Sequence, residues 1–131
     1  MPTTLVEVRR QYTEAEEVAL VDAVHESLVA AFRIPPEDRS VRLVVHEPHR
    51  FACSPNREKP EYATLVSIDC FEGRSVAAKR KLYGQIVDRL AHLGIPRDHV
   101  TITVRESPAH NWGFAGGRAA CDLDLGFDVK V

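Results

Sequence analysis

The chain starts with Met1 and Pro2, so removal of the methionine would leave a proline with a free secondary amine. The reference pKa of an α-amino group is about 8, and it falls when an apolar pocket desolvates the amine or when cations stand close. A neutral amine can take a proton from a carbon beside a carbonyl group and return it elsewhere, which is keto–enol tautomerisation. A nearby carboxylate would instead keep the amine protonated and suited to decarboxylation or hydration. The structural alternative is that Pro2 only starts an edge strand, where its missing N–H is not needed.

A second group with chemical potential is Arg74, which stands between Gly73 and Ser75. Ser75 has the position of a helix N-cap, ahead of an apolar pattern with helical spacing. A guanidinium beside the free N–H groups of a helix start forms a corner that binds a carboxylate. Arg74 is therefore a candidate to bind an acidic substrate, and the alternative is a solvated arginine at a helix start.

The segment HNWGFAGGRAA, late in the chain, combines aromatic and glycine residues. Trp112 and Phe114 could wall a pocket, exclude water and lower the pKa of an amine inside it. Gly113, Gly116 and Gly117 permit a tight chain reversal. The alternative for Trp112 is that it packs in the core or at a subunit boundary.

Composition and charge exclude several classes of function. The 17 basic and 19 acidic residues nearly balance and form no long basic block, so we expect neither a nucleic-acid nor a membrane partner. The 3 cysteines lack a C-x-x-C pair, and His46 and His49 have no further ligands close by in sequence, so we expect free thiols, no metal and no cofactor. The start lacks a signal-peptide pattern and no apolar run reaches about 18 residues, which predicts a cytoplasmic protein.

These residues lie on a chain whose two halves repeat one pattern. In the first half, a strand-like run at 4–9 precedes a helix over about 14–32, whose start has a capping box formed by Thr13 and Glu16. The prolines of IPPEDRSVRLVVHEP then lead into a β-rich run at 41–46, apolar enough on both faces to lie inside a sheet.

The second half repeats the order. A strand within 61–71 is followed by Ser75 as N-cap and by a helix that stops at Gly94. The next segment, IPRDHVTITVRESP, shares with IPPEDRSVRLVVHEP the Ile-Pro start, an Asp in the turn, a β-branched run, a Glu and a final Pro. The sequence therefore predicts a single α/β (α+β) domain over residues 1–131, built of two β-α-β units at about 2–58 and 59–131.

Two such units can pair edge to edge into a four-stranded sheet that carries both helices on one face. The opposite face is left bare, and because the runs at 41–46 and 65–70 are too apolar for water, it needs a partner. The tail CDLDLGFDVKV alternates apolar and polar residues, which predicts a C-terminal β segment that pairs outside its own core. A ring of subunits around packed sheets would satisfy both needs.

The Met-Pro start, the two units, and the stretches GRSVAAKRKLYGQIV and NWGFAGGRA together resemble the tautomerase superfamily over nearly the whole chain. Within it, the chain is most similar to the double-unit subgroup that includes malonate semialdehyde decarboxylase. The resemblance implies a homotrimer, removal of Met1, Pro2 as general acid or base, and a site near Trp112 and Phe114.

The resemblance also implies roles for two other residues. Arg74 matches an arginine that binds substrate carboxylate in the decarboxylases, but Glu72 stands where they have a second arginine. Asp38 falls where they have an aspartate near their proline, and a carboxylate there would favour a protonated Pro2. Because Asp98 holds the equivalent place in the second unit, both aspartates could instead be turn residues.

We therefore expect a cofactor-independent enzyme that tautomerises a small oxo-acid, with Pro2 and Asp38 as catalytic residues. Arg74, Trp112 and Phe114 are the expected substrate-binding residues. Decarboxylation or hydration, as in malonate semialdehyde decarboxylase, is the second hypothesis. A third is a trimer of the same fold that binds a small carboxylate or a protein partner without catalysis.

Overall fold

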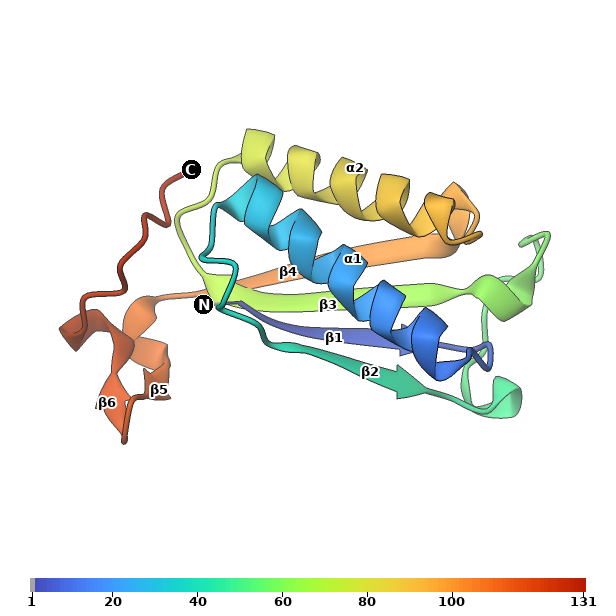
Figure 1. Cartoon of the computed structure of the whole chain (residues 1–131), viewed down its shortest axis with the longest axis horizontal. Coiled ribbons are helices and arrows are strands. Elements are labelled where there is room, and N and C mark those ends of the chain that lie inside the picture. The colour runs from blue at the N-terminus through green and yellow to red at the C-terminus, as the bar shows by residue number, and fades with distance from the viewer. Residues whose placement is uncertain (1) are drawn as a thin grey trace.

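The computed structural model describes residues 2–131 and contains the two β-α-β units (Figure 1). The first unit consists of β1 (Thr3–Val8), α1 (Glu14–Phe32) and β2 (Val41–Val45). The second consists of β3 (Thr64–Phe71), α2 (Val76–His92) and β4 (Val100–Ser107). A small hairpin of β5 (Gly113–Phe114) and β6 (Arg118–Ala119) follows. Short 3₁₀ turns lie at Pro48–Arg50, Pro60–Tyr62, Arg97–His99, Ala109–Asn111 and Ala120–Asp122.

Local capping groups define where both helices start. At α1 the Thr13 hydroxyl accepts from the Glu16 N–H at 3.2 Å while the Glu16 carboxylate accepts from the Thr13 N–H at 2.9 Å, which confirms the predicted capping box. At α2 the Ser75 hydroxyl accepts from the Ala78 N–H at 3.0 Å, as expected of an N-cap. Gly94 follows the end of α2 with φ +91°, a conformation that favours glycine.

The four long strands form one sheet in the order β2-β1-β3-β4. β1 runs parallel to β2 and β3 parallel to β4, while the central pair β1 and β3 is antiparallel. The two units are therefore related by an approximate two-fold axis, and both helices cover the same face of the sheet (Figure 1). The core between the helices and the sheet includes the fully buried Val6, Val24, Leu28, Ile68, Leu82 and Ile86. Each such side chain stabilises the fold by roughly 1.5–3 kcal/mol relative to an exposed one. The predicted fold class is confirmed.

The face of the sheet away from the helices is more polar than expected. The run at 41–46 forms the edge strand β2, in which partly buried and exposed residues alternate, so the prediction that it lies inside the sheet is wrong. Arg42 is exposed, and a two-pronged ion pair joins Arg105 of β4 to Asp69 of β3 at 2.7 and 3.0 Å. Apolar residues remain on this face, since Val44 and Leu65 are 41% and 37% exposed.

The C-terminal arm, residues 123–131, is not the β segment that its alternating pattern predicts. Two turns bend it: the Gly126 N–H donates to the Asp124 carboxylate at 3.0 Å and the Lys130 N–H to that of Asp128 at 2.8 Å. Gly126 also has φ +74°, which an extended strand excludes. Instead of pairing outside the core, the arm returns along its own chain, where Phe127 and Val131 pack against the core. Among residues 2–131, no helix is both long and apolar enough to span a bilayer.

Candidate active site

The candidate site lies at one end of the sheet, where β1 begins and β3 and β4 end. The turn after α1, the start of α2 and the C-terminal arm meet at the same end, on the left of Figure 1. Most of the residues selected from the sequence therefore reach one end of the fold from separate segments.

The strand register brings Pro2 and Asp38 to this end together. The Thr4 N–H donates to the Ser40 carbonyl at 2.9 Å, at the start of the parallel pair β1 and β2. Pro2 lies two residues before Thr4, and Asp38 lies two residues before Ser40. Because the two strands are parallel, both residues lie beyond the same end of the sheet. Pro2 is buried.

Arg74 has a buried guanidinium, with the residue only 5% exposed. Its Nη1 donates to the carbonyl of Phe71 at 3.2 Å, and its Cζ lies 4.9 Å from the centre of the Phe32 ring. Nε and Nη2 are buried and have no hydrogen-bond partner among residues 2–131. Arg74 is thus not a solvated residue at a helix start, and its two N–H groups without partners are suited to receive an anion.

Gly73 and the C-terminal arm explain why Arg74 is buried. Gly73 has φ +131°, and a Cβ there would lie 3.2 Å from the Val129 side chain and 3.3 Å from its carbonyl oxygen. Only glycine allows both this conformation and this approach. The Ser75 hydroxyl then donates to the Val131 carbonyl at 2.8 Å, so the arm is held across the start of α2 on both sides of Arg74.

Three other side chains set the electrostatics around Arg74. Burial lowers the pKa of the Arg74 guanidinium, whereas Cys70, Glu106 and Asp38 act in the opposite direction. Burial also raises the pKa of the Cys70 thiol, so Cys70 is neutral at neutral pH and only the carboxylates of Glu106 and Asp38 then offset the burial of Arg74. Glu106 is paired with Lys79 of α2, and that hydrogen bond raises the pKa of Lys79.

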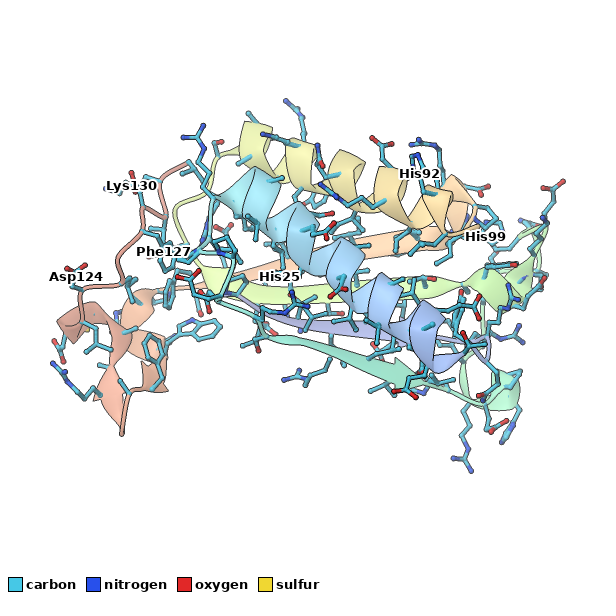
Figure 2. The ribbon with its side chains drawn as sticks, viewed as in Figure 1. His25, His92, His99, Asp124, Phe127 and Lys130 are labelled. Atoms are coloured by element: carbon cyan, nitrogen blue, oxygen red, sulfur yellow. The ribbon has the colours of Figure 1, made fainter. Side chains whose placement is uncertain are left out.

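A cleft of about 430 Å³ has Asp38 and Phe114 among its lining residues, whereas Pro2 and Arg74 do not line it. Asp38 lies on one side of it, on the turn after α1, and Phe114 lies on the hairpin. The C-terminal arm supplies most of the remaining wall, and Figure 2 labels Asp124 and Phe127 on it. The cleft is lined by Pro35, Glu37, Asp38, Phe114, Ala115, Leu123, Asp124, Leu125 and Phe127.

The structure separates the two aromatic residues of the predicted pocket wall. Phe114 lines the cleft, whereas Trp112 donates from Nε1 to the Ser107 hydroxyl at 2.8 Å and packs edge-on against Phe71. Gly116 and Gly117 have positive φ and reverse the chain between β5 and β6, as predicted, but Gly113 does not. Trp112 therefore supports Phe71, whose carbonyl holds Arg74, and does not line the cleft.

Glu72, which stands where the resembled decarboxylases have a second arginine, is exposed. Its backbone N–H donates to the Ser107 carbonyl at 3.0 Å, and within residues 2–131 no ion pair joins its carboxylate to Arg74. The site therefore keeps one buried cation.

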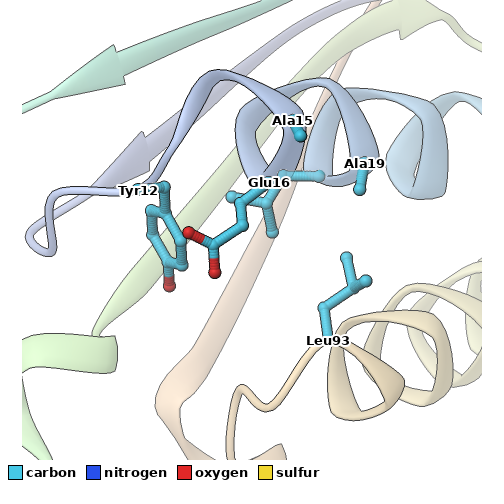
Figure 3. A pocket seen from close by; sticks show the side chains of 6 residues that line it. Tyr12, Ala15, Glu16, Ala19 and Leu93 are labelled. Carbon is cyan, nitrogen blue, oxygen red and sulfur yellow. The ribbon is translucent and has the colours of Figure 1, made fainter.

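A second cavity, of about 250 Å³, lies at the opposite end of the helix pair (Figure 3). Tyr12 and Glu16 are its polar lining residues, and Ala15, Ala19, Leu20 and Leu93 complete the wall. This cavity lies at the end of the helix pair away from Pro2 and Arg74, so it is not part of the candidate site. No cluster of three or more potential metal ligands occurs in the described part of the chain.

Sequence reasoning missed Cys70, Glu106 and Lys79. Glu106 could have been found from the sequence, because it lies near the end of the repeated segment of the second unit as Glu47 lies near the end of that of the first. Cys70 and Lys79 carry no such signal, since a buried strand cysteine and a helix lysine are ordinary in those places. Only the parallel pairing that sets Cys70 beside Glu106 brings them to the site.

Comparison with known proteins identifies the family of this chain. The model of the family described as tautomerase enzyme matches residues 38–115, more than half of the chain, so the chain belongs to this family. A probable tautomerase of Ralstonia nicotianae is 40% identical over 53 residues, which are 40% of this chain and 76% of that protein. The probable tautomerase YusQ of Bacillus subtilis is 23% identical over 91% of this chain and 97% of that protein.

Solved structures are similar over nearly the full length. Malonate semialdehyde decarboxylase, for which decarboxylase and hydratase activities are described, is 25% identical with a TM-score of 0.82, over 93% of this chain and 99% of that one. A fused 4-OT, solved as an asymmetric trimer, has the same fold, with a TM-score of 0.82 and 17% identity over 95% of this chain and 99% of that one.

Proposed function

We propose that this member of the tautomerase family uses Pro2, freed of Met1, as a general acid–base catalyst in the tautomerisation of a small oxo-acid. The observation that carries the proposal is Arg74, which is 5% exposed and has two N–H groups without partners within residues 2–131, at the end of the sheet where Pro2 precedes β1. A buried cation of this kind is suited to the carboxylate of a substrate. Nearby positive charge and burial would also lower the pKa of the Pro2 amine, which suits a base.

The roles follow from placement. Arg74 binds the carboxylate and holds the adjacent carbonyl group near Pro2, which moves a proton between carbon and oxygen. Asp38 lines the cleft and influences the protonation of the amine. Phe114 and Phe127 exclude water from the apolar side of the substrate.

Retention of Met1 tests the proposal directly, because it converts the Pro2 nitrogen into an amide that cannot accept a proton. Preparations with and without Met1, distinguished by intact mass, are compared in the ketonisation of phenylpyruvate. We expect turnover only without Met1, with unchanged thermal unfolding. Pro2→Ala keeps a free but primary amine and should retain a small residual rate. Full activity of the Met1-retaining form would mean that Pro2 only starts a strand.

Decarboxylation or hydration is the second candidate function. It is favoured by the carboxylates of Asp38 and Glu106 around Arg74, which would hold a proton on Pro2, and by the similarity to malonate semialdehyde decarboxylase. Titration of ¹⁵N-labelled Pro2 by NMR distinguishes the two. A pKa of Pro2 below about 7 supports a base and tautomerisation, and a higher one supports an acid and decarboxylation.

We also propose a homotrimer. The sheet face without helices carries the half-exposed Val44 and Leu65, and fused 4-OT proteins of the same fold are solved as trimers.

A further inference from the structure

His25 of α1 is almost fully buried, at 3% exposure, and its side chain makes one hydrogen bond within the described residues. Its Nε2 lies 2.7 Å from the carbonyl oxygen of Pro36. Because a carbonyl oxygen only accepts, Nε2 must carry the hydrogen and donate it. Nδ1 is buried and has no partner within residues 2–131. The polar contact of this ring is therefore directed to the turn that follows its own helix.

Pro36 occupies a decisive place in that turn. The Asp38 N–H donates to the Pro35 carbonyl at 2.9 Å, which closes a β-turn with Pro36 and Glu37 at its centre. The two common turn types differ in the orientation of the peptide between the central residues, and proline at the first central position is compatible with both. The hydrogen bond from His25 holds the carbonyl of that central peptide and so selects one orientation.

The same turn forms one side of the cleft, through Pro35, Glu37 and Asp38. The charge of Asp38 also acts on Arg74, so the two side chains are close enough to influence each other. Reversal of the central peptide would redirect the residues on both sides of it. We propose that His25 is a positioning residue that holds this turn so that the Asp38 carboxylate faces Arg74 and Pro2, an inference that rests on the proposed function.

A second contact ties the same loop to α1 and provides a control. Arg39 Nη2 lies 2.6 Å from Asp22 Oδ1, and Asp22 is three residues before His25 on the helix. Both side chains of this pair are nearly half exposed, at 49% and 44%. An exposed pair contributes little. The buried hydrogen bond of His25 should therefore dominate.

Two amide substitutions separate the hydrogen bond from the ring. In His25→Gln the side-chain nitrogen reaches the position of Nε2, whereas in His25→Asn it reaches only that of Nδ1. With phenylpyruvate as probe, His25→Asn should lower kcat by about 10- to 100-fold with little change in KM, because a misplaced catalytic group slows the chemical step. His25→Gln should restore kcat to within about threefold of the wild type, and Asp22→Asn should leave it unchanged.

Hydrogen exchange gives a readout that does not need activity. The Asp38 amide, which closes the turn, should exchange at least about tenfold faster in His25→Asn than in the wild type, but not in His25→Gln. Circular dichroism establishes that each variant is folded at the assay temperature. The inference would be overturned if folded His25→Asn had the kcat and the Asp38 exchange rate of the wild type. It would also be overturned if His25→Asn and His25→Gln lost kcat to the same extent. If the wild type itself shows no turnover that depends on Pro2, the proposed function fails, and the exchange comparison alone decides the role of His25.

Discussion

The Cζ atom of Arg74 lies 4.9 Å from the centre of the Phe32 ring, so the last residue of α1 supports the cation that precedes α2. This distance is inside the range of about 6 Å over which a ring face attracts a cation. The ring gives the guanidinium a favourable neighbour without using any N–H group. Arg74 can therefore remain buried while Nε and Nη2 stay available for a ligand.

The buried charge of Arg74 predicts opposite effects on activity and stability. In Arg74→Met the carboxylate of the substrate loses its partner. The fall in kcat/KM for a 2-oxo acid should correspond to a loss of roughly 2–3 kcal/mol of transition-state stabilisation. The free energy of unfolding should not fall, because methionine removes a buried charge with unsatisfied N–H groups. Steady-state kinetics and urea unfolding measure the two quantities.

Arg74→Lys is the matched variant, since it keeps the charge but not the planar set of donors. It should recover only part of kcat/KM. Unchanged kinetics in Arg74→Met would mean that Arg74 does not bind substrate.

The exposed sheet face predicts a trimer at micromolar concentration by sedimentation. Leu65→Lys places a charge among the apolar residues of this face and should shift the protein towards monomer, while Val18→Lys on the exposed side of α1 should not. A wild-type monomer at these concentrations would contradict the assembly.

Tyr12 predicts a stabilising substitution. Its hydroxyl is buried with no partner within residues 2–131, and burial raises the pKa of Tyr12 to about 12. Tyr12→Phe removes the unsatisfied group and should raise the free energy of unfolding by about 1 kcal/mol. In Tyr62→Phe, by contrast, Arg10 loses the hydroxyl to which it donates, so stability should fall. Urea unfolding of both variants checks the contrast, and a less stable Tyr12→Phe would contradict it.

The ion pair of Asp69 and Arg105 predicts a pH dependence of stability. The hydrogen bond from Arg105 lowers the pKa of the Asp69 carboxyl below its usual value. A carboxyl with a lowered pKa in the folded state stabilises the fold above its unfolded pKa of about 4, and that stability is lost as the pH falls through the lowered pKa. The wild type should therefore exceed Asp69→Asn in stability at pH 6, and the difference should shrink towards pH 3. A difference that is independent of pH would exclude this role.

The helices, their caps and the two β-α-β units follow from local or repeated signals. Thr13 with Glu16 and Ser75 cap helices through neighbours only three residues away, so the sequence predicts them well. The prediction of a C-terminal β segment was wrong, because the alternation of apolar and polar residues does not reveal the turns at Asp124 and Asp128. The charge environment of Arg74 depends on Glu106, far along the chain, which only strand pairing brings near.

The approximate two-fold axis has a consequence for the number of reactive centres. Tyr12 stands directly before the N-cap Thr13 as Arg74 stands directly before the N-cap Ser75, so the cavity of Figure 3 lies at the counterpart of the candidate site. Joining two units in one polypeptide leaves a single amino terminus, which only the first unit can supply. Under the proposed function, the opposite end therefore has no proline amine, and Tyr12 stands there where the candidate site has Arg74. The proposed function thus gives each chain one reactive end and leaves the other end free to acquire a different function.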